Sequence, residues 1–190
     1  MKSIKERLII VSIMVVLLCT LTTTAFLSSG GVADNIITFG NLRLQLVNHT
    51  INAEGLEVPV EQSNEKLTGT EVSRIIKVRN VCENPMYIRV KIEFKGEDKQ
   101  GVFQANQYVS LMQSSGDWVQ VGDWYYYHPV LEPVKETSNL LEGLQFDLDR
   151  LMTEHVGSTI DLCVYAQAVQ SKHNGTSAEK AQGWPQEAVR

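Results

Sequence analysis

The residues of this sequence that could do acid–base or metal chemistry include four histidines, His49, His128, His155 and His173. A zinc peptidase carries two histidines one helical turn apart with a glutamate between them, and none of these four has such a partner. Glu154 precedes His155, but a second ligand is missing, so this pair indicates the exposed end of a short helix. The sequence also lacks a nucleophile elbow, a phosphate-binding loop and a dinucleotide fingerprint. It therefore favours a protein that is not an enzyme and needs no cofactor and no metal.

Three other patterns in the sequence indicate a chemical function less specifically. Cys163 could be drawn with a distant histidine as a thiol enzyme, but any chain with both residue types permits that drawing. Residues 147–149, Asp-Leu-Asp, resemble a fragment of a calcium loop without its glycine and closing glutamate, so calcium at a sheet edge stays an open alternative. Asn48-His-Thr and Asn174-Gly-Thr match the glycosylation sequon, a weak three-residue pattern.

Cys82 and Cys163 are the two cysteines beyond the N-terminal apolar run. In an exported protein such a pair favours a disulfide, and closing so long a loop would contribute roughly 2–4 kcal/mol. The alternative is two unbridged thiols that pack as small apolar side chains. The sequence does not decide between them, because it does not give the distance between the two residues.

The N-terminus has the order of a secretory signal peptide. Three basic residues within the first seven precede an apolar run at 8–18, and small or hydroxylated residues follow it. Thr23 and Ala25 form a small-x-small cleavage site, which predicts a mature chain that begins at Phe26. The alternative is an uncleaved membrane anchor, because the 20 residues from 8 to 27 are long enough to span a bilayer.

The predicted signal helix at 1–25 and the predicted domain at 26–190 differ in charge. The chain has 17 Lys+Arg and 22 Asp+Glu, of which the signal holds three basic residues and one acidic residue. The mature chain then has 14 and 21, a net charge near −7. An acidic surface argues against nucleic acid as a partner, because phosphate contacts need clustered Lys and Arg. It favours a mature form that is soluble outside the cell and is not an integral membrane protein.

The mature chain shows mainly the period-two alternation of β-strands. Leucines at 42, 44 and 46 alternate with polar residues, and Ile88, Val90 and Ile92 alternate with charged ones. Strands are predicted at 41–47, 71–81, 86–94, 118–127, 140–147 and 160–169. Connections are predicted at 52–69, 95–101, 113–117 and 170–183, and short helices at 147–155 and at 176–181, the latter with a capping box of Thr176 and Glu179.

Short alternating strands joined by turns and long loops describe a single antiparallel β-sandwich with one or two short helices. A mature chain of about 165 residues is long enough to bury a proper core. The fold class predicted from the sequence is therefore mainly β.

The aromatic run Trp-Tyr-Tyr-Tyr at 124–127 raises the question of a binding platform. If 118–127 is one strand, Trp118, Trp124 and Tyr126 lie on one face and Tyr125 and Tyr127 on the other. One face would then pack into the core, and the second would be covered by a loop or by a partner. We take Tyr125 and Tyr127 as the candidate interaction surface.

An ordered set of motifs along the chain resembles one family. Thr24-Ala25-Phe26-Leu27-Ser28 is similar to the exit from that family's signal, and NIITFGNLRLQL at 35–46 to its first leucine-rich strand. Residues 69–94 resemble its Asn-x-x-x-x-Pro-x-Tyr-x-Arg-Val pattern. Residues 124–147 and 164–185 resemble its Trp-Tyr-Tyr and Gly-Trp segments. The chain thus resembles the SipW-dependent exported proteins of Gram-positive bacteria, the TasA/camelysin class, and especially their "alternate signal-mediated exported" branch.

The resemblance implies a jelly-roll-like sandwich that is secreted and acts as a matrix or surface-fibre component. The implied partners are further copies or related matrix proteins, and the signal peptidase during export. Relatives build fibres by donating an N-terminal segment, which here is 26–39, and an open sheet edge accepts such a strand through main-chain hydrogen bonds. The alternative is that this arm packs on its own subunit. The donor strand would consist of Asn35, Ile36, Ile37, Thr38 and Phe39.

Two qualifications accompany the resemblance. After Pro133 the family usually has glycine, whereas this chain has Val134, so we expect a different local turn. Camelysin-type relatives have been described as metallopeptidases, which this sequence does not support because the ligand set is missing. A second hypothesis for function is a secreted module that binds a polymer or another protein through the aromatic strand or through 95–117.

Overall fold

The structure is a computed structural model of the 190-residue chain. It describes residues 26–28, 36–39, 42–60, 64–66, 69–114 and 116–185. Thr23 and Ala25 of the predicted cleavage site lie outside these ranges, as do the rest of the predicted signal and Asn35 of the predicted donor strand. The described part consists of two β-sheets with short helical segments, so the mainly-β prediction is confirmed.

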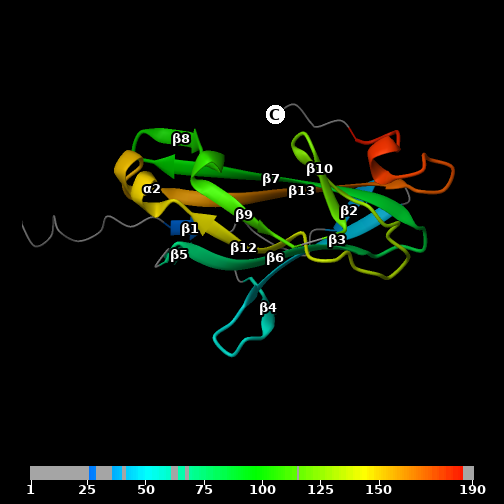
Figure 1. The fold of residues 1–190 in the computed structure, drawn as a ribbon, viewed down its shortest axis with the longest axis horizontal. Helices are drawn as coiled ribbons and strands as arrows, with labels where there is room; N and C mark the ends of the chain where they lie inside the picture. The colour runs from blue at the N-terminus through cyan, green and yellow to red at the C-terminus, as the bar shows by residue number, and fades with distance from the viewer. Residues whose placement is uncertain are drawn as a thin grey trace, which may run out of the picture.

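The larger sheet is built around its two longest strands, which pair antiparallel from Met86 opposite Gln170 to Glu97 opposite Thr159. Its strands pair antiparallel except β1, which runs parallel to β13. Figure 1 shows these two long strands side by side along the length of the molecule. The order across the sheet is β10 (Trp118–Val121), β11 (Trp124–Tyr127), β7 (Met86–Asp98), β13 (Thr159–Gln170), β1 (Phe26–Ser28) and β5 (Asn64–Lys66), with β8 (Gly101–Gln104) paired to the far end of β7.

The smaller sheet is antiparallel throughout its described pairs. A register shift between Leu141 and Gly143 marks a bulge where its fourth strand meets both neighbours. The order across the sheet is β2 (Ile36–Phe39), β3 (Leu42–Ile51), β6 (Glu71–Asn80), β12 (Leu141–Phe146) and β9 (Val109–Gln113), and β4 (Glu57–Pro59) pairs with the outer end of β3.

The two sheets enclose one apolar core, which side-chain alternation explains. On β3, Leu42, Leu44 and Leu46 are buried and the intervening Arg43 is exposed. The same alternation buries one face of β7 and one face of β13, as their sequences predict. The centre of the core joins both sheets, with Leu44, Ile76 and Leu144 from the smaller and Ile88, Val90 and Ala166 from the larger.

The helical segments are short. The predicted helix at 147–155 is present as α2 (Leu148–Glu154), and the carboxylate of Asp147 accepts a hydrogen bond from Arg150 N at its N-terminus. The predicted helix at 176–181 is reduced to the 3-10 turn η2 (Ala178–Lys180), and η1 (Asn106–Tyr108) is a further 3-10 turn. Within the described residues no helix is long and apolar enough to cross a bilayer.

The prediction of one strand at 118–127 is wrong, because the chain reverses in the middle of it. Gly122 has φ +61°, and this glycine conformation starts a two-residue turn that brings Val121 opposite Trp124. Trp118 then lies opposite Tyr127 and shares its face, whereas a single strand would place it with Trp124. The sequence did carry the signal for this hairpin, Gly-Asp between two β-branched or aromatic runs.

Two connections predicted as loops contain strands. The segment 52–69 includes β4 and β5, and β7 continues through the predicted loop at 95–101 before returning as β8. The glycine at position 96 is one reason why a loop was predicted here. In the structure it pairs with Phe103, whose ring occupies the space that a side chain at position 96 would need.

Candidate functional site

Tyr125 and Tyr127, the predicted interaction surface, lie in the core instead. Both are buried and belong to the apolar cluster between the sheets. The Tyr127 ring centre is 5.0 Å from that of Trp118. The Tyr125 hydroxyl accepts a hydrogen bond from Gln113 Nε2 at 3.1 Å, and burial raises the pKa of Tyr125. The prediction was wrong because alternation separates two faces without telling which of them meets the second sheet.

The other two aromatics of the run, Trp124 and Tyr126, point to the outer face of the larger sheet. There the C-terminal segment crosses the sheet and covers Tyr126, which is 9% exposed. The ring of Trp184 meets the ring of Tyr126 edge-on, with centres 5.9 Å apart. This outer cluster consists of Tyr87, Tyr126, Val169, Ala178 and Ala181, with Trp124 and Trp184 packed against it.

Arg89 is the centre of this outer cluster. Its guanidinium carbon lies 4.1 Å from the ring centre of Trp124 and 4.7 Å from that of Trp184, so the cation is stacked between two indoles. Its Nε and Nη2 both donate to Gln167 Oε1, at 2.9 and 2.7 Å. Its Nη1 donates to the Tyr126 hydroxyl at 3.3 Å. A planar guanidinium suits these contacts because it can stack and donate from several nitrogens at once.

Next to the covered region the outer face carries a row of side chains with exposed apolar residues at its two ends and the half-buried Trp124 and Lys91 between them. Val121 lies opposite Trp124, Trp124 opposite Lys91, and Lys91 opposite Tyr165, in one row across four strands. Val121 is 51% exposed and Tyr165 41%. We call Val121, Trp124 and Tyr165 the exposed row. It is the part of the aromatic hairpin that a partner could contact.

The predicted donor arm, 26–39, contributes a strand to each sheet. β1 lies between β13 and β5, with Leu27 opposite Ile160 on one side and Glu65 on the other. β2 pairs with β3 at the edge of the smaller sheet. In the single chain, therefore, the described parts of the arm pack on their own subunit, which is the second of the two alternatives that the sequence left open.

β1 covers only a small part of the edge that it occupies. It pairs with residues 159–161 of β13, and from Leu162 to Gln170 the same edge pairs with none of the described strands. The described part of the smaller sheet likewise ends at β2. Both strands of the arm are thus held by main-chain pairing at or near sheet edges.

Cys82 and Cys163 are free thiols, so the disulfide alternative is wrong. Cys82 is buried next to the start of β7, whose Met86 lies opposite Gln170. Cys163 lies seven residues before Gln170, on the outer face opposite Glu93, and burial raises the pKa of its thiol. Seven strand residues span about 23 Å, whereas bridged cysteines need Cα atoms within about 7 Å.

A polar cluster that the sequence did not reveal joins α2 to the end of the β7–β8 hairpin. His155 Nδ1 lies 2.7 Å from Asp98 Oδ2, and the His155 ring stacks on Phe103 with centres 3.5 Å apart. The Tyr108 hydroxyl donates to Glu154 at 2.6 Å. The bond from His155 is the largest influence that lowers the pKa of Asp98, and the bond from Tyr108 likewise lowers that of Glu154.

The Asp98–His155 pair resembles the carboxylate–histidine pair of a general base, but the described structure places no nucleophile beside it. A carboxylate–histidine pair acts in catalysis when the second imidazole nitrogen meets a nucleophile or a substrate. Of the hydroxyls nearest to His155 along the chain, Thr153 donates to Asp149 O, and Ser158 is fully buried with no hydrogen bond from its Oγ within the described structure. The geometry therefore supports a structural tie between α2 and the hairpin.

The remaining residues singled out in the sequence have structural roles. Asp147 of the calcium-like segment caps α2, and the described residues contain no group of three His, Cys, Asp or Glu that could hold a metal. Asn48 of the first sequon is 7% exposed and therefore closed to modification in the folded state. Asn174 of the second exchanges two hydrogen bonds with the backbone of Gln182, at 3.0 and 2.8 Å.

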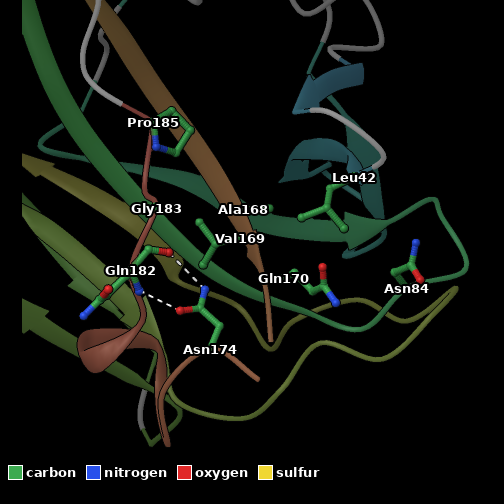
Figure 2. Close-up of a pocket in the computed structure, with 9 residues that line it drawn as sticks. All are labelled: Leu42, Asn84, Ala168, Val169, Gln170, Asn174, Gln182, Gly183 and Pro185. Carbon is green, nitrogen blue, oxygen red and sulfur yellow. Dashed lines mark hydrogen bonds between the residues drawn. The ribbon is translucent and has the colours of Figure 1, made fainter. Parts of the chain in front are cut away.

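A pocket of about 540 Å³ lies beside this Asn174–Gln182 contact (Figure 2). It opens between the C-terminal segment, the end of β13 and the start of β3. Figure 2 shows amide side chains and apolar ones around the pocket, and no lining residue is ionisable, so the pocket contains no acid or base of its own. Its lining consists of Leu42, Asn84, Ala168, Val169, Gln170, Asn174, Gln182, Gly183 and Pro185.

Sequence reasoning missed Arg89 and Trp184 as a pair, although each stands in a recognisable context. Arg89 lies on the polar face of a strongly alternating strand, and Trp184 stands between glycine and proline, directly after the connection predicted at 170–183. The sequence did contain one signal for this contact. Trp124 and Tyr126 lie on one face of their strand, and if that face is the outer one, another segment of the chain has to cover them. The distance between 89 and 184 along the chain hid the contact.

No protein-family model matches this chain, and neither a curated protein nor a solved structure is significantly similar to it.

Proposed function

We propose that the chain is a secreted, non-catalytic structural protein that builds or accompanies an extracellular fibre or biofilm matrix. In this proposal it belongs to the SipW-dependent exported proteins, TasA/camelysin class, and its sandwich has the jelly-roll-like form of that class. A signal helix at 1–25 is removed after Ala25, and the new N-terminus at Phe26 is the first residue of the donor arm.

The observation that supports assembly is the placement of the arm. β1 begins at Phe26 and enters the larger sheet through pairs with β13 and β5, and β2 then joins the edge of the smaller sheet. Main-chain pairing of this kind depends little on which molecule supplies the strand, so the arm of one copy can occupy the same positions in the next. Such donation is heterologous and does not close, and therefore yields filaments.

The polar clusters support a structural role rather than a chemical one. Arg89 is committed to two indoles and Gln167, and Asp98 to His155 and the turn after β7. In both places the charged groups hold a peripheral segment onto the sandwich. Each contact makes the surface more rigid, which suits a building block outside the cell.

The experiment is to purify the secreted form, determine its N-terminus and image it by negative stain. We expect a chain that starts at Phe26 and forms filaments, and a chain without Phe26–Phe39 that retains a β-sheet circular dichroism spectrum but stays monomeric. Deletion of the last five residues, 186–190, is the matched control and should leave the filaments intact. Filaments from the chain without the arm would contradict the proposal.

A second candidate function rests on the exposed row. Its side chains come from β10, β11 and β13, with Lys91 of β7 between Trp124 and Tyr165, and aromatic residues in line on a sheet can bind a polymer or a protein. For that function the chain should be monomeric and bind its polymer saturably. Binding should be lost on Trp124→Ala and Tyr165→Ala, and unchanged on Val102→Ser, an exposed site on β8.

A further inference from the structure

The chain that follows β13 turns back over the outer face of the larger sheet. We call residues 171–185 the C-terminal strap, which is the orange and red end of the ribbon in Figure 1. Ala178 and Ala181 of the strap are buried in the outer cluster. Trp184 follows them and stacks on Arg89, with 4.7 Å from its ring centre to the guanidinium carbon. These contacts hold the strap on the sheet.

One asparagine side chain closes the strap into a loop. Asn174 Nδ2 donates to Gln182 O at 3.0 Å, and Asn174 Oδ1 accepts from Gln182 N at 2.8 Å (Figure 2). One of these bonds requires a donor and the other an acceptor, which a side-chain amide supplies together. The closed form of the strap therefore depends on an intact amide at position 174.

The residue after Asn174 is glycine, and no other asparagine of the sequence is followed by one. The side-chain amide of an asparagine can react with the next main-chain nitrogen. Glycine permits this reaction best, because it has no side chain and the widest range of backbone angles. The turn also requires glycine here, since Gly175 has φ +75° and a Cβ on it would lie 3.0 Å from Lys180 O. The fold thus keeps a reactive dipeptide beside the contact that closes the strap.

The reaction is hydrolysis of the side-chain amide through a cyclic imide. The Gly175 nitrogen loses its proton to solvent and attacks Asn174 Cγ, so that a bond from this nitrogen to Cγ forms. The bond from Cγ to Nδ2 then breaks, and Nδ2 takes up a proton and leaves as ammonia. Water opens the imide at either carbonyl, which gives aspartate or isoaspartate. The co-reactant is water, which reaches Asn174 through the pocket of about 540 Å³ beside it.

In the closed strap this reaction is slowed. Both polar atoms of the Asn174 amide are bonded to Gln182, so rotation of the amide toward the Gly175 nitrogen breaks both bonds. The strap therefore has to open first, and the stacking of Trp184 on Arg89 opposes the opening. A peripheral segment of this kind opens locally without unfolding of the whole domain.

The product cannot close the strap as asparagine does. A carboxylate at position 174 has only acceptor atoms, so an oxygen replaces the donor that lies 3.0 Å from Gln182 O. Its charge has no partner in the pocket, because no lining residue is ionisable. The basic residues of the strap, Lys172, His173 and Lys180, are exposed, and ion pairs with exposed groups contribute little.

We propose that Asn174 is a site of spontaneous deamidation and that this modification releases the C-terminal strap from the outer face of the larger sheet. Release uncovers Tyr126, which is 9% exposed under the closed strap, beside the exposed row. Each molecule changes only once, because the ammonia is lost. The proposal does not depend on assembly into fibres or on strand donation.

The first test measures the reaction in the full chain. Peptide mapping by mass spectrometry follows conversion at residue 174 in mildly alkaline buffer. We expect conversion about tenfold slower in the folded parent than in the same chain unfolded in urea, a factor that corresponds to about 1.4 kcal/mol. Trp184→Ala should react severalfold faster than the parent, and Tyr165→Ala, an aromatic change on the same face outside the strap, at the parent's rate. Equal rates for the parent and Trp184→Ala, or no conversion in urea, would overturn the proposal.

The second test asks whether the product releases the strap. Trypsin cleavage after Lys180, between the buried Ala178 and Ala181, requires an open strap. Asn174→Asp should be cut there severalfold faster than the parent, with an unchanged circular dichroism spectrum. Asn84→Asp adds the same charge to the same pocket without a contact to Gln182 and should be cut at the parent's rate. Cleavage of Asn174→Asp at the parent's rate would show that the modification leaves the strap closed and would contradict the proposal.

Discussion

Two clusters of aromatic side chains lie on opposite faces of the same hairpin and are stabilised differently. On the inner face, Tyr125 and Tyr127 join Trp118 in the main core, where burial of apolar surface dominates. On the outer face, Trp124 and Tyr126 are held by one arginine and by the C-terminal segment, through stacking and directed hydrogen bonds.

This difference between the two faces explains how one hairpin accommodates four adjacent aromatic residues. The inner pair is buried between the two sheets, so a change there costs stability of the whole domain. The outer pair depends on a segment that follows the last strand, and the coverage is incomplete, since Val121 stays 51% exposed. The inner cluster therefore supplies stability, and the outer face supplies the surface that can interact.

The largest effect is expected from the inner cluster. Tyr127→Ala removes a ring that is buried against Trp118, and large aromatic-to-alanine changes in cores cost about 3–5 kcal/mol. Urea unfolding followed by circular dichroism measures this loss. Tyr127→Phe keeps the ring and is the control. A loss below about 1 kcal/mol for Tyr127→Ala would show that the two clusters do not differ as described.

A smaller loss is expected from the outer cluster. Arg89→Ala removes the stacked cation and the donors to Gln167 and Tyr126, for which we expect about 2 kcal/mol. Arg89→Lys should not restore it, because an ammonium cannot stack and donate as a guanidinium does. Limited proteolysis should cut the Arg89→Ala variant first after residue 170. Cleavage there at the parent's rate would contradict the role of Arg89 in holding the C-terminal segment.

A gain in stability is expected from a substitution in the loop between β11 and β12. Val134 has φ +61° and is 69% exposed, so a β-branched residue occupies a conformation that favours glycine. Val134→Gly should therefore raise the free energy of unfolding by about 1 kcal/mol. Val130→Gly, at an exposed neighbour without a positive φ, should lower it or leave it unchanged, and an equal gain there would argue against strain at 134.

The smallest effect concerns the polar cluster at the other end of β7. The pKa of Asp98 is lowered, chiefly by His155, so its carboxylate stabilises the fold above the ordinary aspartate pKa and loses this effect as the pH falls through the lowered value. Asp98→Asn should thus lower the melting temperature at neutral pH, and the difference should shrink as the pH falls below about 4 and vanish only below the lowered pKa of Asp98. A difference that persists in acid would show that the carboxylate charge is not the cause.

The sequence predicted the strands that bury one face each. β3, β7 and β13 alternate strongly, and α2 has a capping aspartate, so for these elements the local pattern was sufficient; β6 and β12 were also predicted, from strand-like composition. The short strands β4, β5, β8 and β9 were missed, because their positions depend on pairing with distant partners rather than on their own pattern. Whether the turn at Val134 differs from the family's stays a prediction; in this chain the residue has a positive φ of 61°, which favours glycine.

The candidate site could be predicted only in part. The sequence predicted one strand in the arm, at 35–39, but not β1, and the distribution of β1 and β2 between two sheets depends on tertiary pairing. It placed aromatics on two faces of a strand, but the side that meets the core follows from the packing of the sheets, and Tyr125 and Tyr127 were assigned to the wrong side. The partners of Arg89 and His155 are far apart in the chain, which no local pattern reveals.

The measurement that tests strand donation most directly is a disulfide trap between two copies. Ser28 and Asp161 are neighbours across the β1–β13 pair. In a background of Cys82→Ala and Cys163→Ala, one chain carries Ser28→Cys and a chain of different mass carries Asp161→Cys. The account predicts a mixed disulfide in assembled samples only. Disulfides that form readily within one chain carrying both changes, but never between the two chains after assembly, would contradict it.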